Sequence, residues 1–276
     1  MRELNGKVAV ITGGGSGIGR ATALTLAGRG AVLAICDLDA GLAKTTAEDI
    51  MANGGSAHAY QVDVASEPAM RDLASKVISD HGVVDIVMNN AGVLVAPTPT
   101  ADVPIDRFRR VMDVNFWGVV YGSLFFLPHL LARTQANLVN VASNAGLVAY
   151  SRVASYNASK FGVRGFTETL RMETRRTPLR VTLVCPGNTH TSLAANSPVM
   201  DERQGATMQR FLDRVPGRPV EAVARAIVRG IERDRPRVLT GLDTFALDTI
   251  ARLAPGAHSR LLAPGIERFL DKTLGR

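Results

Sequence analysis

Cysteine, tryptophan and long apolar segments are all scarce in this chain of 276 residues. Its two cysteines, Cys36 and Cys185, lie in apolar, strand-like runs, and two are too few for a disulfide framework or a metal site. We expect buried free thiols in a reducing cytoplasm and no bound metal. No basic and apolar leader precedes the first strand-like run, and no apolar run reaches the length of a membrane-spanning helix. Neither a secretory signal nor a transmembrane segment is therefore expected.

Aromatic residues make up only 5% of the chain, and no nucleic-acid motif accompanies its basic residues. The formal net charge is +7, with the arginines scattered except for Arg225, Arg229 and Arg233, which are four apart on one predicted helix. We interpret this stripe as a solvated helix face. Contact with an anionic substrate tail or an acidic membrane surface is the less favoured alternative.

Strand-like and helix-like segments alternate along the chain. Strands are predicted at Val8–Thr12, Ala31–Cys36, Ala57–Val62, Asp85–Met88, Leu138–Ala142, Val181–Cys185 and Arg237–Thr240. Helices are predicted at Gly17–Gly28, Ala40–Asn53, Ser66–Asp80, Ile105–Ala132, Ser155–Thr177 and Val220–Arg233. Continuous apolar strands separated by helices indicate a parallel sheet covered on both faces. The predicted fold class is α/β, a doubly wound parallel sheet in a three-layer α/β/α arrangement.

One domain is expected to span residues 1–241, with a helical tail at 242–276. In the tail, Phe245, Leu247, Ile250 and Leu253 suggest one amphipathic helix, and Leu261, Leu262, Ile266, Phe269 and Leu270 suggest another. We expect the tail to pack on its own domain or on a partner subunit. A pocket cover or a membrane-surface contact remains an alternative.

A glycine-rich turn joins the first strand to the first helix. It contains Gly13, Gly15, Ser16, Gly17, Ile18 and Gly19 in a GxxxGxG spacing. Such a turn lets backbone approach a pyrophosphate closely, and the following helix N-terminus favours negative charge. A merely flexible turn is less favoured, because this one lies between a strand and a helix. The turn therefore predicts a dinucleotide-binding Rossmann fold.

Asp37 ends the second predicted strand, followed by Leu38. A carboxylate at this position can accept hydrogen bonds from the adenosine ribose of NAD, and it would repel the additional phosphate of NADP. Asp37 could instead only cap the next helix. We predict NAD as the cofactor, with NADP less favoured.

Five motifs in order resemble the short-chain dehydrogenase/reductase family, in its compact single-domain branch. They are the glycine turn, Asp63-Val64, Asn89-Asn90-Ala91-Gly92, Ser143 with Tyr156-Asn157-Ala158-Ser159-Lys160, and Pro186-Gly187. The resemblance implies that Asp63 and Val64 contact the adenine and that Asn90, Ala91 and Gly92 lie along the cofactor. It also implies that Pro186 and Gly187 flank the nicotinamide, that Thr191 bonds its carboxamide, and that Asn115 holds a water linking Lys160 to solvent. Thr189 stands where the family often has an aliphatic residue.

The chemistry expected of Tyr156 depends on its neighbours. A free tyrosine, with a pKa of about 10, is a poor base at neutral pH. Lys160 follows four residues later on the same predicted helix, so its ammonium can favour the phenolate. Ser143, at the end of a predicted strand, can hold the substrate oxygen and stabilise developing charge. These residues predict a general acid and base for oxidation of an alcohol or reduction of a ketone.

The segment at about 192–215 is expected to form a lid over the substrate. Further pocket residues are predicted at Leu94, Val95, Leu147, Tyr150 and Met200. Their apolar and aromatic surface favours a fairly apolar secondary alcohol or ketone. The resemblance also implies a homodimer or homotetramer formed through the long helix and the Tyr156 helix.

Two other functions are weighed against this one. A protein that only senses dinucleotide redox state would need no Ser143, Tyr156 and Lys160 set. An epimerase-type enzyme with transient oxidation also carries YxxxK, but the form of the motifs and the chain length disfavour it.

Overall fold

The computed structural model describes residues 1, 3–254, 257, 260 and 264, and within them seven strands form one parallel sheet. The strand order is β3-β2-β1-β4-β5-β6-β7. The strands are β1 (Val8–Thr12), β2 (Val32–Asp37), β3 (Ser56–Gln61), β4 (Ile86–Asn89), β5 (Ala136–Val141), β6 (Leu179–Pro186) and β7 (Arg237–Thr240). This is the doubly wound sheet that the alternation of segments predicted. The second amphipathic segment predicted in the tail, Leu261 to Leu270, lies outside the described residues.

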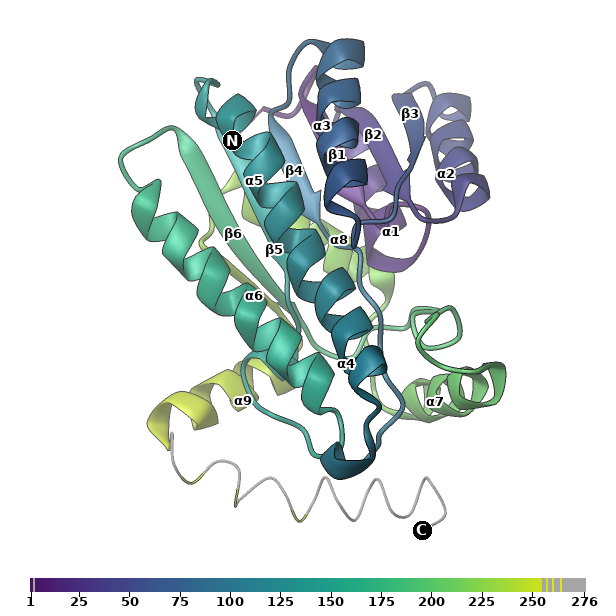
Figure 1. The fold of residues 1–276 in the computed structure, drawn as a ribbon. Helices are drawn as coiled ribbons and strands as arrows, with labels where there is room; N and C mark the ends of the chain where they lie inside the picture. The colour runs from purple at the N-terminus through teal and green to yellow at the C-terminus, as the bar shows by residue number, and fades with distance from the viewer. Residues whose placement is uncertain (2, 255–256, 258–259, 261–263, 265–276) are drawn as a thin grey trace.

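Helices cover both faces of the sheet (Figure 1). They are α1 (Gly17–Ala27), α2 (Ala40–Ala52), α3 (Glu67–His81), α4 (Ile105–Met112), α5 (Gly118–Leu131), α6 (Ala154–Glu173), α7 (Glu202–Arg214), α8 (Val220–Glu232) and α9 (Leu242–Leu253). Side chains of α3, α5 and α6 share one core with β1, β2 and β5, and those of α1, α2 and α8 share a second core on the opposite face. The apolar strands are buried because helices pack against both of their sides.

The chain turns at polar residues where helices begin. The carboxylate of Asp39 accepts hydrogen bonds from the Gly41 and Leu42 N–H groups at the start of α2, and the hydroxyl of Ser66 accepts from Ala69 N–H at the start of α3. Such capping satisfies N–H groups that have no partner inside a helix. The predicted helix reaching Thr177 instead ends at Glu173, with Thr174 as its C-cap; the Thr174 hydroxyl donates to Leu170 O, and the Thr177 hydroxyl donates to Thr174 O.

The long predicted helix is continuous through α4 and α5 but contains a π-helical turn at Asp113–Trp117. Within its 27 residues, Ile105–Leu131, an 18-residue window has a mean hydropathy of 1.3, so by length and composition alone this helix could span a membrane, contrary to the expectation that no segment could. Half of the apolar window is buried inside the protein. Its packing against α3, β4 and β5 explains why the segment is so apolar.

Candidate functional site

A cavity of about 1350 Å³ lies at the carboxyl ends of the strands. Ligands bind at this edge in open parallel sheets, where the order of strands reverses. Here β1 is flanked by β2 and β4, so the reversal falls beside β1. The cavity wall includes these predicted site residues: Gly13, Ser16, Gly17, Ile18, Asp37, Leu38, Asp63, Val64, Asn90, Ala91, Gly92, Leu94, Ser143, Tyr150, Tyr156, Lys160, Pro186, Gly187, Thr189 and Thr191.

The glycine turn has the shape that a pyrophosphate needs. Gly13 and Gly17 have φ values of +63° and +50°, which side chains disfavour, and a Cβ on Gly13 would lie 2.9 Å from the Cα of Ala91. Ser16 makes no side-chain capping bond, and the first turn of α1 contains no acidic residue. The N–H groups of that turn are therefore left for an anion. Gly15 and Gly19 lie outside the cavity lining, where they allow close packing of the turn.

Asp37 stands at the end of β2, on the wall beside the glycine turn. Its carboxylate accepts hydrogen bonds from Gly15 N–H (2.9 Å) and Asp39 N–H (3.1 Å), so its orientation is fixed. The nearby Arg20 is paired with Asp49 on α2 at 2.6 Å. Among the described residues of this wall no arginine is unpaired, and an acidic group in that setting fits the ribose hydroxyls of a dinucleotide.

Asp63 has a partner that the motifs did not reveal. Its carboxylate accepts from Ala65 N–H at 3.0 Å and forms an ion pair with Arg110 of α4, also at 3.0 Å. Arg110 itself lines the cavity. The pair joins the loop after β3 to the long helix and brings two polar groups to the end of the cavity expected to hold the adenine.

Ser143, Tyr156 and Lys160 lie together at the opposite end. The Ser143 hydroxyl follows β5, accepts from Ala145 N–H at 3.2 Å and donates to Asn144 Oδ1 at 3.1 Å. The Lys160 ammonium lies 5.8 Å from the Tyr156 ring centre and donates to the carbonyl of Val141 at 3.2 Å. Lys160 is buried, with 4% of its surface exposed. All three residues line the same cavity, so their polar groups are available to a bound substrate.

The pKa shifts at this end do not follow the simple expectation of a lysine-stabilised phenolate. Burial raises the pKa of Tyr156, and the nearby Ser143 hydroxyl only partly opposes it. Burial lowers the pKa of Lys160 to about 8. Lys160 alone therefore does not produce the expected lowering of the Tyr156 pKa. Without a further positive charge, the neutral phenol is the favoured form of Tyr156.

Asn115 lies in the π-helical turn, behind the cavity wall rather than on it. Its side chain accepts from Val93 N–H at 2.7 Å and donates to Val93 O at 3.0 Å and Ser159 Oγ at 3.3 Å. These bonds fix the loop after β4 against the Tyr156 helix. The side-chain amide thus holds two elements together, and the water-holding role that the family resemblance implies stays a prediction.

Three predicted pocket residues do not line the cavity. Val95 belongs to the hydrophobic core that also includes side chains of α3, α5 and α6, and Leu147 packs in a cluster with Val163 of α6. Met200 lies behind the wall, in the cluster that joins Leu94 to the lid helix α7. The apolar character of these three residues could not show whether they line the cavity or pack in the core, because apolar side chains occur in both places.

The wall also includes Leu193, Met208, Phe211, Leu212 and Val215, which belong to the segment at about 192–215 that was expected to cover the substrate. Asp243 and Leu247 of α9 line the cavity too, and neither was predicted as a pocket residue. The predicted amphipathic pattern of residues 245–253 was the available signal for α9, since it allowed a pocket cover as one alternative.

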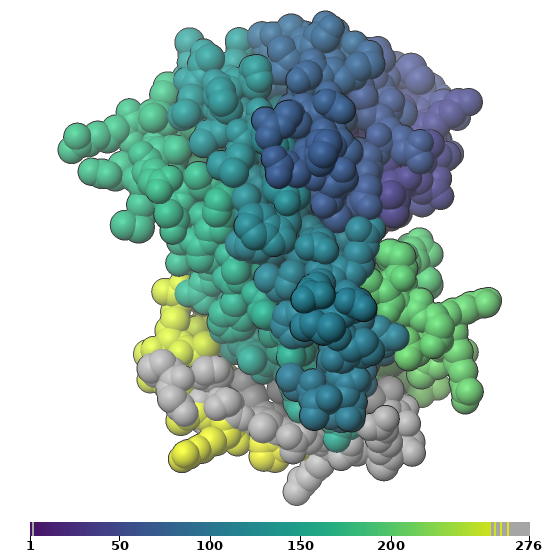
Figure 2. All heavy atoms as spheres, in the orientation of Figure 1, coloured from purple at the N-terminus to yellow at the C-terminus, as the bar shows by residue number. Residues whose placement is uncertain are grey.

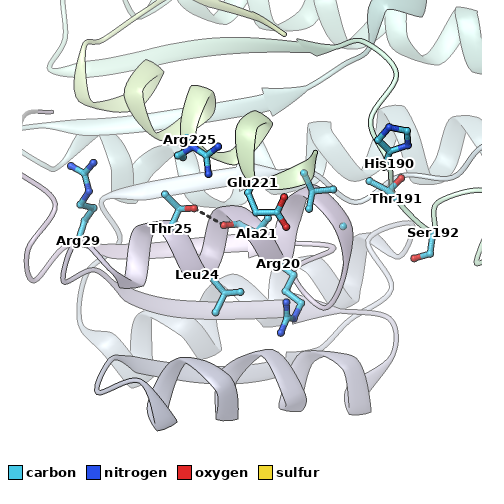
Figure 3. Close-up of a pocket in the computed structure, with 12 residues that line it drawn as sticks. Arg20, Ala21, Leu24, Thr25, Arg29, His190, Thr191, Ser192, Glu221 and Arg225 are labelled. Atoms are coloured by element: carbon cyan, nitrogen blue, oxygen red, sulfur yellow. Dashed lines mark hydrogen bonds between the residues drawn. The ribbon is translucent and has the colours of Figure 1, made fainter. Parts of the chain in front are cut away.

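A second cavity, of about 630 Å³, lies between α1 and α8 (Figure 3). Its lining includes Arg20, Arg29 and Arg225, with Glu221 among them, and His190 faces it rather than the larger cavity. Arg225, Arg229 and Arg233 are all exposed, as expected of a solvated helix face.

A family model described as short chain dehydrogenase matches residues 7–202. The chain belongs to this family. The match spans the glycine turn, the Ser143 strand end and the Tyr156 helix.

Particular relatives agree with this assignment. A putative oxidoreductase, SadH, of Mycobacterium tuberculosis is 41% identical over 98% of both chains. A cyclohexanol dehydrogenase of an Acinetobacter species is 36% identical over 70% of this chain and 77% of its own length. A short-chain dehydrogenase/reductase from Burkholderia phymatum, solved in complex with NAD, is 31% identical, has a TM-score of 0.85, and covers 92% of this chain and 96% of its own. A nicotinamide dinucleotide is therefore the cofactor class to which the cavity corresponds.

Proposed function

We propose that the chain transfers a hydride between a nicotinamide dinucleotide and a secondary alcohol or ketone, with Tyr156 as the general acid and base. The observation that carries this proposal is one continuous cavity with the glycine turn at one end and Ser143, Tyr156 and Lys160 at the other. The dinucleotide, when bound along Gly13–Gly19 and Asp37, would accept or supply the hydride.

The chain's own residues handle the substrate oxygen and its proton. The Ser143 hydroxyl, fixed by Ala145 N–H, would exchange its Asn144 partner for the substrate oxygen. Tyr156 would donate its proton to a ketone oxygen, for which the raised pKa keeps it in the phenol form. In alcohol oxidation Tyr156 must accept that proton. The positive charges of Lys160 and of the oxidised nicotinamide together would favour the phenolate.

Asn115 has a positioning role in this proposal, since it bonds Val93 and Ser159 and touches neither reacting group. The water relay from Lys160 to solvent stays a prediction drawn from the family.

NAD is the proposed cofactor rather than NADP. The support is the fixed carboxylate of Asp37 on the cavity wall and the pairing of Arg20 with Asp49. A second negative charge beside Asp37 would be repelled, and no unpaired arginine of the described residues at this wall offsets it.

An alicyclic or similarly apolar alcohol is the proposed substrate. The substrate end is lined by Leu94, Phe211 and Leu247, among other apolar residues, and a relative bears the name cyclohexanol dehydrogenase. The proposed location is the cytoplasm, where buried thiols such as Cys36 and Cys185 remain reduced.

We also propose that the chain assembles as a dimer or tetramer through the face of α5 and α6. These helices lie side by side in Figure 1. Their exposed apolar side chains include Leu124, Leu131, Phe161 and Met172, together with Trp117 of the π-helical turn. An apolar face of this kind is typical of an interaction surface.

The decisive experiment compares Tyr156→Phe with the unmodified protein in NAD-dependent oxidation of cyclohexanol and related alcohols. Loss of the hydroxyl should lower kcat/KM by about 10²- to 10⁴-fold while NAD binding is retained. Tyr121→Phe is the matched control, because Tyr121 lies on α5, outside the cavity lining. Full activity of Tyr156→Phe would contradict the assigned base. Tight NAD binding by the unmodified protein without turnover of any alcohol would instead support the alternative function, a protein that only senses dinucleotide redox state.

A further inference from the structure

The helix α9 forms part of the wall of the main cavity. Asp243, in its first turn, and Leu247, one turn later, both line it. In Figure 1, α7 and α9 lie on either side of the end of the molecule where the strands finish, and Figure 2 shows the described C-terminal residues, in yellow, at that end. The substrate end is therefore enclosed from two sides, by the lid and by this helix.

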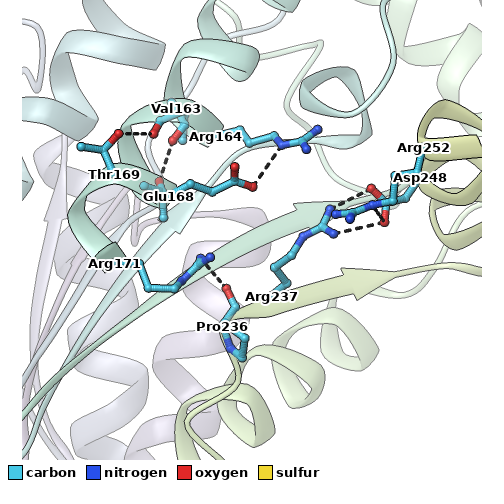
Figure 4. A network of polar contacts seen from close by, with 11 residues as sticks. Val163, Arg164, Glu168, Thr169, Arg171, Pro236, Arg237, Asp248 and Arg252 are labelled. Atoms are coloured by element: carbon cyan, nitrogen blue, oxygen red, sulfur yellow. Dashed lines mark hydrogen bonds and ion pairs between the residues drawn. The ribbon is translucent and has the colours of Figure 1, made fainter. Parts of the chain in front are cut away.

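A network of ion pairs fixes α9 from outside the cavity (Figure 4). Asp248, largely buried, receives two hydrogen bonds from the guanidinium of Arg237, at 2.8 and 3.1 Å, and one from Arg252 at 3.0 Å. The Thr244 hydroxyl donates to Thr240 O at 3.2 Å, which joins the start of α9 to the end of β7. The position of Asp243 is thus set by a rigid connection rather than by a free tail.

The Asp243 carboxylate lies beside the catalytic end of the cavity. A Cβ built on Gly187 would be 2.8 Å from Asp243 Oδ2, which places this carboxylate against the turn after β6. Its charge also acts on Tyr150, whose pKa is raised first by burial and then by Asp243 and Tyr156. Unlike Asp248, Asp243 has no cation within ion-pair distance in the part of the chain that the structure describes.

The other charges of the described lining give an anion no counterpart at this end. Arg110 is paired with Asp63 at the other end, and Asp37 and Asp39 are acidic. Lys160 is buried and bonded to Val141 O. A substrate carboxylate would therefore meet the unpaired negative charge of Asp243, and the one cation of the described lining at this end, Lys160, is already bonded to Val141 O.

We propose that Asp243 selects substrates by charge, so that this enzyme accepts neutral secondary alcohols and ketones and rejects those with a nearby carboxylate. This inference rests on the proposed function. It adds a residue that determines specificity in the segment beyond the nucleotide-binding sheet.

The test uses two ketones of nearly equal size, 3-oxocyclohexane-1-carboxamide and 3-oxocyclohexane-1-carboxylate. Their affinities are measured by calorimetry with the NADH-loaded protein, and their kcat/KM values are measured where turnover occurs. The unmodified protein should prefer the carboxamide. In Asp243→Asn that preference should fall about fivefold, as expected for removal of one like charge in a partly solvated site.

Glu202→Gln is the matched control, because Glu202 is an exposed acid in the first turn of α7 and does not line the cavity. Glu202→Gln should leave the preference for the carboxamide over the carboxylate unchanged. An unchanged ratio in Asp243→Asn, or no affinity for either ketone, overturns the inference. Because binding is read separately, selective binding without turnover would count against the proposed reaction and not against the role of Asp243.

Discussion

Replacing Lys160 with methionine should make the cofactor-free protein more stable while removing its activity. Burial lowers the pKa of Lys160 from 10.5 to about 8, so holding the ammonium in the folded state costs about 3 kcal/mol at neutral pH. Methionine keeps most of the apolar stem but leaves Val141 O without its hydrogen bond, a loss of about 1 kcal/mol. The net gain is about 2 kcal/mol, or about 4–8 °C in Tm for a chain of this size.

The pH dependence gives this prediction its sharpest form. Between pH 8 and 10.5 the unfolded chain binds more protons at Lys160 than the folded chain does, so the stability of the unmodified protein rises with pH across this window. The advantage of Lys160→Met should be full below pH 8 and disappear by pH 10.5. Urea unfolding at several pH values measures it, with Lys44→Met, at an exposed lysine, as the control. A destabilised Lys160→Met at pH 7, or a pH-independent difference, would refute the reasoning.

Three further predictions concern other parts of the chain. Asp37→Asn should raise kcat/KM for NADP relative to NAD by about tenfold, because one repelling charge is removed; an unchanged ratio of initial rates would contradict the NAD assignment. Asn137→Val should raise the unfolding free energy by about 1–3 kcal/mol, because neither amide atom of this fully buried side chain has a partner among the described residues; calorimetric melting checks it, and a lower Tm would count against it. Trp117→Glu should shift sedimentation toward smaller species, and an unchanged profile would exclude this face as the interface.

The features that could be predicted from the sequence are those determined by residues close together in the chain. Each strand could be located because its apolar run is bounded by turns, and the glycine turn is recognisable because its positive φ values at Gly13 and Gly17 require glycine. Tyr156 and Lys160 share a helical face because they are four residues apart.

The features that were missed depend on how distant segments meet. Leu94 and Val95 are adjacent and both apolar, yet Leu94 faces the cavity and Val95 is buried in the core, which composition does not reveal. Arg110 reaches Asp63 across 47 positions, and Asp243 lies against the turn at Gly187 on a helix that the Arg237–Asp248 pair joins to β7. The direction of the Tyr156 pKa shift likewise depends on burial, which the YxxxK spacing does not show.

The order of strands places the residue proposed to set cofactor preference far from the residue proposed to set substrate range. Asp37 ends β2, whereas α9 follows β7, and these strands are five positions apart in the sheet, about 24 Å at the usual spacing between strands. Substitutions at such a separation combine additively when they share no partners. Cofactor preference and substrate range should therefore be adjustable one at a time, so that a lineage, or an engineer, can exchange NAD for NADP at β2 without resetting the choice of alcohol beside β7.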